Sequence, residues 1–139
     1  MADYIPDINA LLPQGPPFIM VDRFLACEGP ATRTSLVVRA DNPLVWDGRF
    51  SVAGLIENIA QTAAAGAGHR ALRASLPPRT GAVVAISRLE VGVLPLTGEE
   101  LITEATVTGE VGDIIVISGR ITCRDAIVAE AELKILAGI

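Results

Sequence analysis

The sequence predicts an α+β protein in which an antiparallel β-sheet packs against one long, buried α-helix. Two observations support this fold class. Strand-like segments are grouped on either side of one helical segment, residues 52–72, and do not alternate with helices. Residues 60–68 of that segment read AQTAAAGAG, which leaves the helix almost without side-chain bulk. A length of 139 residues is typical of one domain, so we expect a single domain over residues 1–139.

The N-terminal part of the chain is expected to form a short helix and two strands. The helix is indicated by the spacing of four apolar residues, Ile5, Ile8, Leu11 and Leu12. The following PQGPP ends it, because proline cannot continue a helix. Residues 18–27 (FIMVDRFLAC) and 31–40 have the composition of strands, and residues 41–48 read as a loop.

The long helix is expected to begin after Ser51, whose hydroxyl suits an N-cap. Gly66 and Gly68 each reduce helix stability by about 1 kcal/mol. That cost is reasonable if the helix lies very close to another backbone segment. We therefore expect the sheet to cover the alanine row of this helix, which consists of Ala60, Ala63, Ala64 and Ala67.

Four further strands are expected after the helix, at residues 81–91, 100–110, 114–123 and 126–136. The second of them alternates strictly, with one face formed by Leu101, Thr103, Ala105 and Val107. Short polar breaks such as Gly112-Asp113 and Arg124-Asp125 separate the last three strands. Such breaks favour antiparallel hairpins.

Composition and charge exclude several classes of protein. Apolar residues make up 50% of the chain and charged residues 19%, which is unlike a disordered protein. The net charge of −5 and the absence of a basic stripe argue against nucleic-acid binding. The longest uncharged stretch, residues 8–21, is interrupted by three prolines and is too short to span a membrane. The start MADYIPDI lacks the pattern of a signal peptide, so we expect a cytoplasmic protein.

The few potential metal ligands do not form a recognisable site. Cys27 and Cys123 match no metal-binding spacing and are expected to be reduced cysteines of the core. His69 has no second histidine or nearby cysteine with which to bind zinc. The sequence therefore predicts neither a metal nor a cofactor.

Four segments, in order along the chain, resemble the (3R)-hydroxyacyl-acyl-carrier-protein dehydratases. LLPQGPPFIMVDRFL resembles the family's opening, and VWDGRFSVAGLIENIAQTAA resembles its catalytic loop and central helix. SRLEVGVLPLTGEEL and VAEAELKIL resemble two later segments. The resemblance implies the hotdog fold, in which an antiparallel sheet wraps around a central helix. The altered loop is similar to that of the dehydratase-like proteins of aryl-polyene pigment clusters.

The family resemblance also implies a substrate and a site. The substrate would be a 3-hydroxyacyl thioester of acyl carrier protein or CoA, in fatty-acid or polyketide-type biosynthesis. The family's catalytic pair is one His and one acidic residue from different subunits of a dimer, and the acidic residue corresponds to Glu57. The resemblance thus predicts a homodimer or dimer-based oligomer and an apolar thioester tunnel. Its expected residues are Glu57, Gln61 and Arg49 as catalytic groups, with Gly54, Phe50 and Asn58 binding substrate.

This sequence departs from the family at the catalytic histidine, where it has Arg49. Dehydration requires a base for the α-proton, and arginine stays protonated at neutral pH. His69 lies about 18 Å along the helix from Glu57, too far to replace that base, and is expected to be a helix-end histidine. Arg49 and Glu57 are as suited to a structural ion pair as to catalysis.

Three functions remain open from the sequence. The first is a dehydratase-like lyase that depends on Glu57 and has a changed or lost histidine role. The second is an acyl thioesterase in which Glu57 activates water. The third is a non-catalytic partner subunit that forms a heteromer with an active dehydratase paralogue. For the first two, N–H groups near Ala53 to Leu55 at the helix start would polarise the thioester carbonyl.

Overall fold

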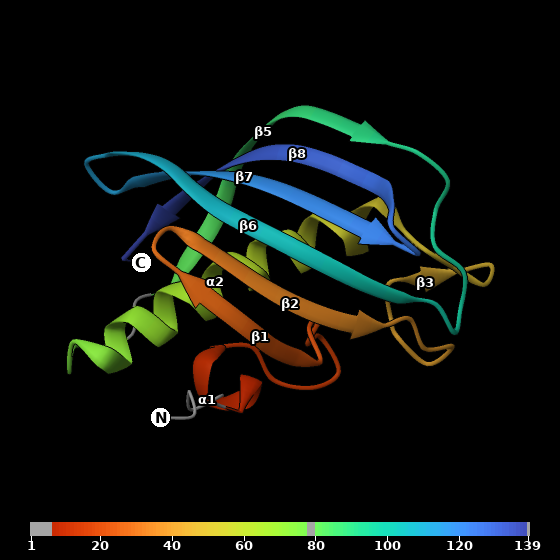
Figure 1. Cartoon of the computed structure of the whole chain (residues 1–139), viewed down its shortest axis with the longest axis horizontal. Helices are drawn as coiled ribbons and strands as arrows, with labels where there is room; N and C mark the ends of the chain where they lie inside the picture. Colours follow the sequence, from red (N-terminus) through yellow and green to blue (C-terminus); the bar gives the residue numbers. More distant parts are fainter. Residues whose placement is uncertain (1–6, 78–79, 139) are drawn as a thin grey trace.

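The computed structural model describes residues 7–77 and 80–138 of the chain. Its main sheet has six antiparallel strands in the order β1-β2-β6-β7-β8-β5, and a two-stranded sheet pairs β3 with β4. The elements are α1 (Ile8–Leu11), β1 (Arg23–Glu28), β2 (Ala31–Val37), β3 (Val45–Trp46), β4 (Arg49–Phe50), α2 (Val52–Arg73), β5 (Gly81–Val91), β6 (Glu100–Val111), β7 (Ile114–Cys123) and β8 (Ala126–Ala137). Figure 1 shows the strands curving across α2, with β1 and β5 at opposite edges. The predicted α+β arrangement is confirmed.

Helix α2 has the ends that its sequence predicts. The Ser51 side chain accepts a hydrogen bond from the Gly54 N–H, which satisfies one of the free donors of the first turn. Arg70 and Arg73 lie in the last turn, where cations interact favourably with the helix dipole. The helix ends at Arg73, one residue beyond the predicted end.

Two glycines of α2 allow close contact with neighbouring elements. A Cβ atom on Gly66 would collide with the Thr32 side chain of β2. A Cβ atom on Gly68 would lie 2.6 Å from the backbone oxygen of Leu11 in α1. The propensity cost of these glycines is therefore explained by close approach, as the sequence predicts.

One face of α2 forms the core with the sheet. Leu55 and Ile59 are fully buried and pack in one cluster with sheet residues that include Leu101, Ile121 and Leu133. The prediction that the sheet buries the alanine row is only partly right. Ala60, Ala63 and Ala64 are half-buried and Ala67 is exposed, because the row lies beside the covered face of the helix.

The N-terminal strand is shorter than predicted. We expect a strand from residue 18 to residue 27, but β1 begins only at Arg23. The reason is that backbone groups of Phe18 and Met20 are hydrogen-bonded to side chains of α2 and not to another strand. The predicted loop at residues 41–48 contains β3, and the predicted helix at residues 5–12 lies partly outside the described residues.

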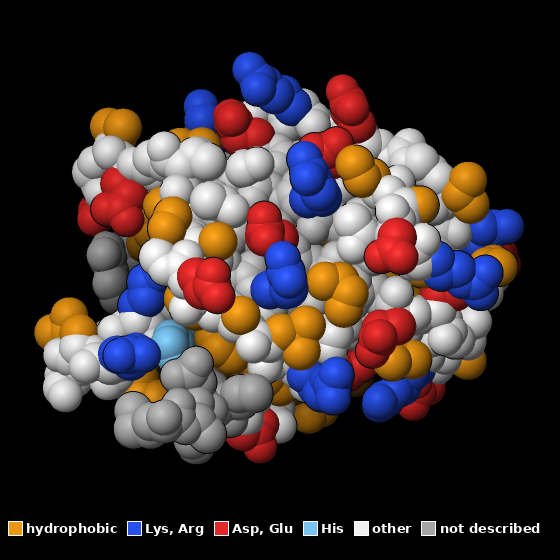
Figure 2. Space-filling view, viewed as in Figure 1, with side chains coloured by type: hydrophobic (Ala, Val, Ile, Leu, Met, Phe, Trp, Pro, Cys, Tyr) orange, Lys and Arg blue, Asp and Glu red, His pale blue; other side chains and the backbone are white. Residues whose placement is uncertain are grey.

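Charged side chains alternate across the outer face of the sheet. Arg33, Glu104, Arg120 and Glu130 occupy directly paired positions on four neighbouring strands, and we call them the charge row. Arg33 is 3.2 Å from Glu104, and Arg120 is 3.2 Å from Glu130. Both pairs are exposed, so each contributes at most about 1 kcal/mol to stability. Figure 2 shows acidic and basic side chains interspersed on this view of the molecule.

Strand β5 presents an open edge. It pairs with β8 on one side, and no described residue pairs with its other side. Its apolar side chains Val84, Ile86 and Leu89 are exposed. Such an edge offers free backbone donors and acceptors to another strand.

No helix among residues 7–77 and 80–138 combines the length and apolar character needed to cross a membrane.

Candidate functional site

Glu57 lies in the first half of α2 and is half-buried. Its Oε1 atom accepts a hydrogen bond of 3.1 Å from Nε2 of Gln61, one turn further along the helix. Their separation by four residues places both on one helix face, as the sequence predicts. No other hydrogen bond or ion pair reaches this carboxylate from the described residues, so Oε2 has no partner among them.

Gln61 is fully buried, and the protein uses both ends of its amide. Its Oε1 atom accepts a hydrogen bond of 2.7 Å from the Met20 N–H. Its Nε2 atom donates to the Phe18 carbonyl at 2.8 Å as well as to Glu57. These contacts fix the orientation of the amide, so Gln61 presents its Nε2 atom to the Glu57 carboxylate in a fixed direction.

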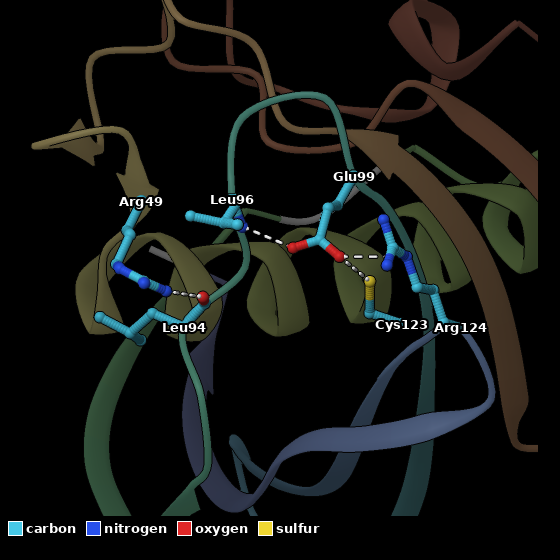
Figure 3. A network of polar contacts seen from close by, with 6 residues as sticks. All are labelled: Arg49, Leu94, Leu96, Glu99, Cys123 and Arg124. Carbon is cyan, nitrogen blue, oxygen red and sulfur yellow. Dashed lines mark hydrogen bonds and ion pairs between the residues drawn. The ribbon is translucent and has the colours of Figure 1, made fainter.

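Arg49, at the position of the family's histidine, contacts a loop and not Glu57. Its Nη1 atom donates a hydrogen bond of 2.9 Å to the Leu94 carbonyl, as Figure 3 shows. Its backbone also forms an isolated β-bridge with Leu96. Arg49 and Glu57 form no ion pair within the described part of the chain, because the guanidinium is directed to the loop that follows β5.

The same loop is held at its other end by Glu99. The Glu99 carboxylate accepts hydrogen bonds from the Leu96 N–H at 2.8 Å and from the Cys123 thiol at 3.3 Å, and it lies 3.4 Å from Arg124 (Figure 3). The Leu96 N–H and the Cys123 thiol, with Arg124, hold the pKa of Glu99 below its ordinary value of 4.5. Burial and Glu99 raise the pKa of Cys123, which keeps this free thiol protonated.

Glu99→Gln is expected to reduce stability at neutral pH but not in strong acid. A carboxyl whose pKa is lowered by folding stabilises the native state above its unfolded-state pKa, and this contribution disappears as the pH falls through the lowered value. The difference in Tm between wild type and variant should therefore shrink between about pH 6 and about pH 2. Glu104→Gln, at an exposed ion pair, is the control. A Tm difference independent of pH would contradict the role assigned to Glu99.

The three residues predicted to bind substrate are buried inside the chain. Phe50 and Asn58 are fully buried, and the Phe50 ring occupies the space where Gly54 lacks a Cβ atom. Asn58 donates a hydrogen bond of 2.7 Å to the Met20 carbonyl and accepts one from the Thr103 hydroxyl. Direct binding of substrate by these three residues stays a prediction, whereas their contacts within the chain are clear.

The N-terminal N–H groups of α2 are less available than the sequence suggests. The Gly54 N–H donates to the Ser51 side chain and the Leu55 N–H donates to the Ser51 carbonyl. Of the three groups considered, only the Ala53 N–H has no acceptor among the described residues. Ala53 is also exposed, which makes its N–H the candidate donor to a thioester carbonyl.

His69 is placed near the end of α2, as predicted. Its ring lies 5.0 Å from the ring of Phe24, and its Nδ1 atom is buried without a hydrogen-bond partner. Burial, with Arg73 and Arg70 nearby, lowers the pKa of His69. These contacts belong to the end of the helix opposite to Glu57, so His69 is not the partner of that carboxylate within one chain.

Sequence reasoning missed the link between the N-terminal segment and the site. Phe18 and Met20 hold Gln61 through their backbone groups. The residue types at these two positions do not reveal such contacts, because they are made by the backbone. Asn58 gave one usable signal. A polar residue at helical spacing from Leu55 and Thr62 lies on the buried face, where it must find a hydrogen-bond partner.

Comparisons with known proteins agree with this architecture. No curated protein matches the chain. Among solved structures, the dehydratase heterocomplex ApeI:P from Xenorhabdus doucetiae has a TM-score of 0.88 at 16% identity, over 99% of this chain and 93% of that one. The Escherichia coli PaaI protein from the phenylacetic acid degradation operon has a TM-score of 0.65 at 14% identity, over 81% and 80% of the two chains.

A hypothetical thioesterase from Streptococcus pneumoniae TIGR4, solved with coenzyme A, has a TM-score of 0.64 at 13% identity, over 83% of this chain and 84% of that one. These likenesses confirm the hotdog fold that the sequence predicts. The ApeP-like family, described as ApeP dehydratase, matches residues 6–138. The resemblance to dehydratases of the pigment branch is thus confirmed, and the chain belongs to the ApeP-like dehydratase family.

Proposed function

We propose that this chain is one subunit of a heteromeric dehydratase that removes water from 3-hydroxyacyl thioesters of acyl carrier protein or CoA. The chain supplies Glu57, and a partner subunit supplies the base. The observation that carries this proposal is the separate placement of Glu57 and Arg49. Glu57 is held by Gln61 through one oxygen and has no partner at the other among the described residues, while Arg49 replaces the histidine and is directed to Leu94. The ApeI:P structure, described as a dehydratase heterocomplex, is a precedent for a heteromeric dehydratase.

The chemistry divides naturally between two subunits. The base of the partner takes the proton on the carbon next to the thioester carbonyl, and a carbon–carbon double bond forms as the C–O bond breaks. Glu57 donates a proton to the departing hydroxyl, which leaves as water. The Ala53 N–H at the start of α2 polarises the thioester carbonyl. The product is a 2-enoyl thioester, consistent with biosynthesis of fatty-acid, polyketide or aryl-polyene chains.

The open edge of β5 is the proposed surface for the partner. Its exposed apolar side chains and free backbone groups suit pairing with an edge strand of another hotdog subunit. A partner at this edge would supply the remaining wall of the predicted thioester tunnel. A chain paired with a dehydratase paralogue in this way belongs in the cytoplasm, where carrier-protein thioesters are made.

Reconstitution tests the proposal. The chain alone is expected to form no enoyl product from a 3-hydroxyacyl thioester, and the mixture with a histidine-bearing paralogue encoded beside its gene is expected to form it. Mass spectrometry of the thioester and an assay of free thiol are run together. Thiol release that depends on Glu57 would instead identify a thioesterase. Full activity of the paralogue by itself would contradict a catalytic contribution from this chain.

Two lysine substitutions provide a matched control for the interface. Ile86→Lys places a charge on the open edge of β5 and is expected to abolish co-elution with the partner and formation of enoyl product. Val111→Lys changes a residue that is more exposed, 76% against 44%, at the end of β6. It is expected to leave both unchanged. An equal loss of co-elution and of enoyl product in both variants would argue against the β5 edge as the interface.

A further inference from the structure

A layer of buried polar side chains lies between α2 and the elements that contact it. Thr34, Thr62, Thr103, Asn58 and Gln61 are all fully buried. Buried polar groups are costly unless they are hydrogen-bonded, and each of these five has a partner within the chain. Such a satisfied network fixes geometry more tightly than apolar packing, because each hydrogen bond requires a direction as well as a distance.

Met20 is held at both ends of its backbone by this layer. Its N–H donates to Gln61 at 2.7 Å, and its carbonyl accepts from Nδ2 of Asn58 at 2.7 Å. Asn58 and Gln61 are three residues apart on α2, so their side chains lie on the same helix face. On its other side the Asn58 amide accepts a hydrogen bond from Thr103 of β6, which ties this arrangement to the sheet.

The contacts continue from Met20 to the candidate catalytic carboxylate. The Gln61 amide that accepts from Met20 also donates from Nε2 to Glu57. A shift of the Met20 backbone would therefore turn the Gln61 amide and move the oxygen of Glu57 that it holds. Displacements of about 1 Å in a reacting group can reduce rates by about 100-fold.

We infer that Asn58 is a positioning residue for Glu57. It holds the Met20 carbonyl, Met20 orients Gln61, and Gln61 orients the carboxylate. Asn58 thus acts on Glu57 through the protein, in keeping with its complete burial. This inference rests on the proposed function, because it takes Glu57 as the group that acts on the thioester.

The test uses the heteromeric complex with Asn58→Ala and the matched control Thr34→Val. Thr34 is equally buried and bonds to Thr62 at 2.7 Å, one helical turn beyond Asn58, and it forms no hydrogen bond with Met20 among those of the described residues. Asn58→Ala is expected to lower kcat by about 10- to 100-fold with little change in KM. It should also shift the alkaline limb of the pH–kcat profile, because Glu57 acts in its protonated form. Thr34→Val is expected to lower Tm by a similar amount but to leave kcat and the pH profile near wild type.

A double-mutant cycle adds a readout that is independent of stability. Because Asn58 acts through Gln61, the losses in kcat from Asn58→Ala and Gln61→Ala should not multiply, whereas those from Thr34→Val and Gln61→Ala should. If Asn58→Ala does not fold, Thr103→Val, which removes the hydroxyl that orients Asn58, is used and should lower kcat more than Thr34→Val.

The outcomes separate this inference from the proposed function. Equal kcat values for Asn58→Ala and Thr34→Val, or losses that multiply with Gln61→Ala, would overturn the positioning role. If the complex with Glu57→Gln is inactive at the same time, the proposed function stands without it. Full activity of the Glu57→Gln complex would overturn both.

Discussion

The heteromeric complex carrying Glu57→Gln is expected to lose dehydratase activity by about 100-fold or more, the size of effect typical of a general acid. Glutamine preserves the shape of the side chain and an oxygen that can accept from Gln61 Nε2. It cannot donate a proton to the leaving hydroxyl as a carboxylic acid does. The rate of enoyl formation at saturating substrate measures the loss, and circular dichroism and co-elution with the partner check the fold.

Glu104→Gln is the matched control for this substitution. Glu104 carries the same side chain on the outer face of the sheet, where it pairs with Arg33 at 3.2 Å. Its substitution is expected to leave the rate unchanged. Retention of more than a tenth of the activity by the Glu57→Gln complex would show that another group protonates the hydroxyl.

Phe50→Ala is expected to destabilise the fold by about 3–5 kcal/mol, the usual cost of removing a buried phenylalanine ring. Phe50 is fully buried, and its ring fills the space beside Gly54, where a Cβ atom would lie 2.7 Å from ring atom Cζ. Gly54→Ala in the wild type is therefore expected to cost about 1–3 kcal/mol through overpacking. In the Phe50→Ala background the same change should stabilise α2 by up to about 1 kcal/mol, because alanine favours helix.

Urea denaturation of the wild type, both single variants and the double variant measures this reversal of sign. The free energies of unfolding are compared at constant m-value, so that changes in the unfolded state are excluded. Gly15, which has no heavy atom within 4 Å of an added Cβ, is the control position for glycine-to-alanine substitution. A Gly54→Ala effect of the same sign in both backgrounds would disprove the contact with Phe50 as its cause.

The regular elements of this fold follow from local sequence patterns. Alternation and short polar breaks predict β6, β7 and β8 to within one residue, and the Ser51 cap predicts the start of α2. The same reasoning wrongly predicts a strand at residues 18–22. Its composition is that of a strand, but side chains more than 35 positions away, on α2, take its backbone hydrogen bonds. Composition cannot reveal a partner so distant in sequence.

The candidate site is likewise predictable where it depends on local sequence and unpredictable where it depends on distant contacts. Helical spacing alone places Gln61 beside Glu57, and the structure contains that hydrogen bond. The direction of Arg49 is not predictable, because it depends on the loop at Leu94 to Leu96 folding back next to β4. The position of an arginine in a motif indicates its neighbours in sequence, whereas the carbonyl that it reaches is set by tertiary structure.

The charge row across the outer face has a consequence for the shape of larger assemblies. A second sheet stacked on this face would remove the two ion pairs of the row from water, and the desolvation of such pairs can exceed their mutual attraction. Neighbours that join at the β5 edge leave these charges hydrated. Subunits are therefore expected to add side by side, which extends one curved surface, and not to build up in layers.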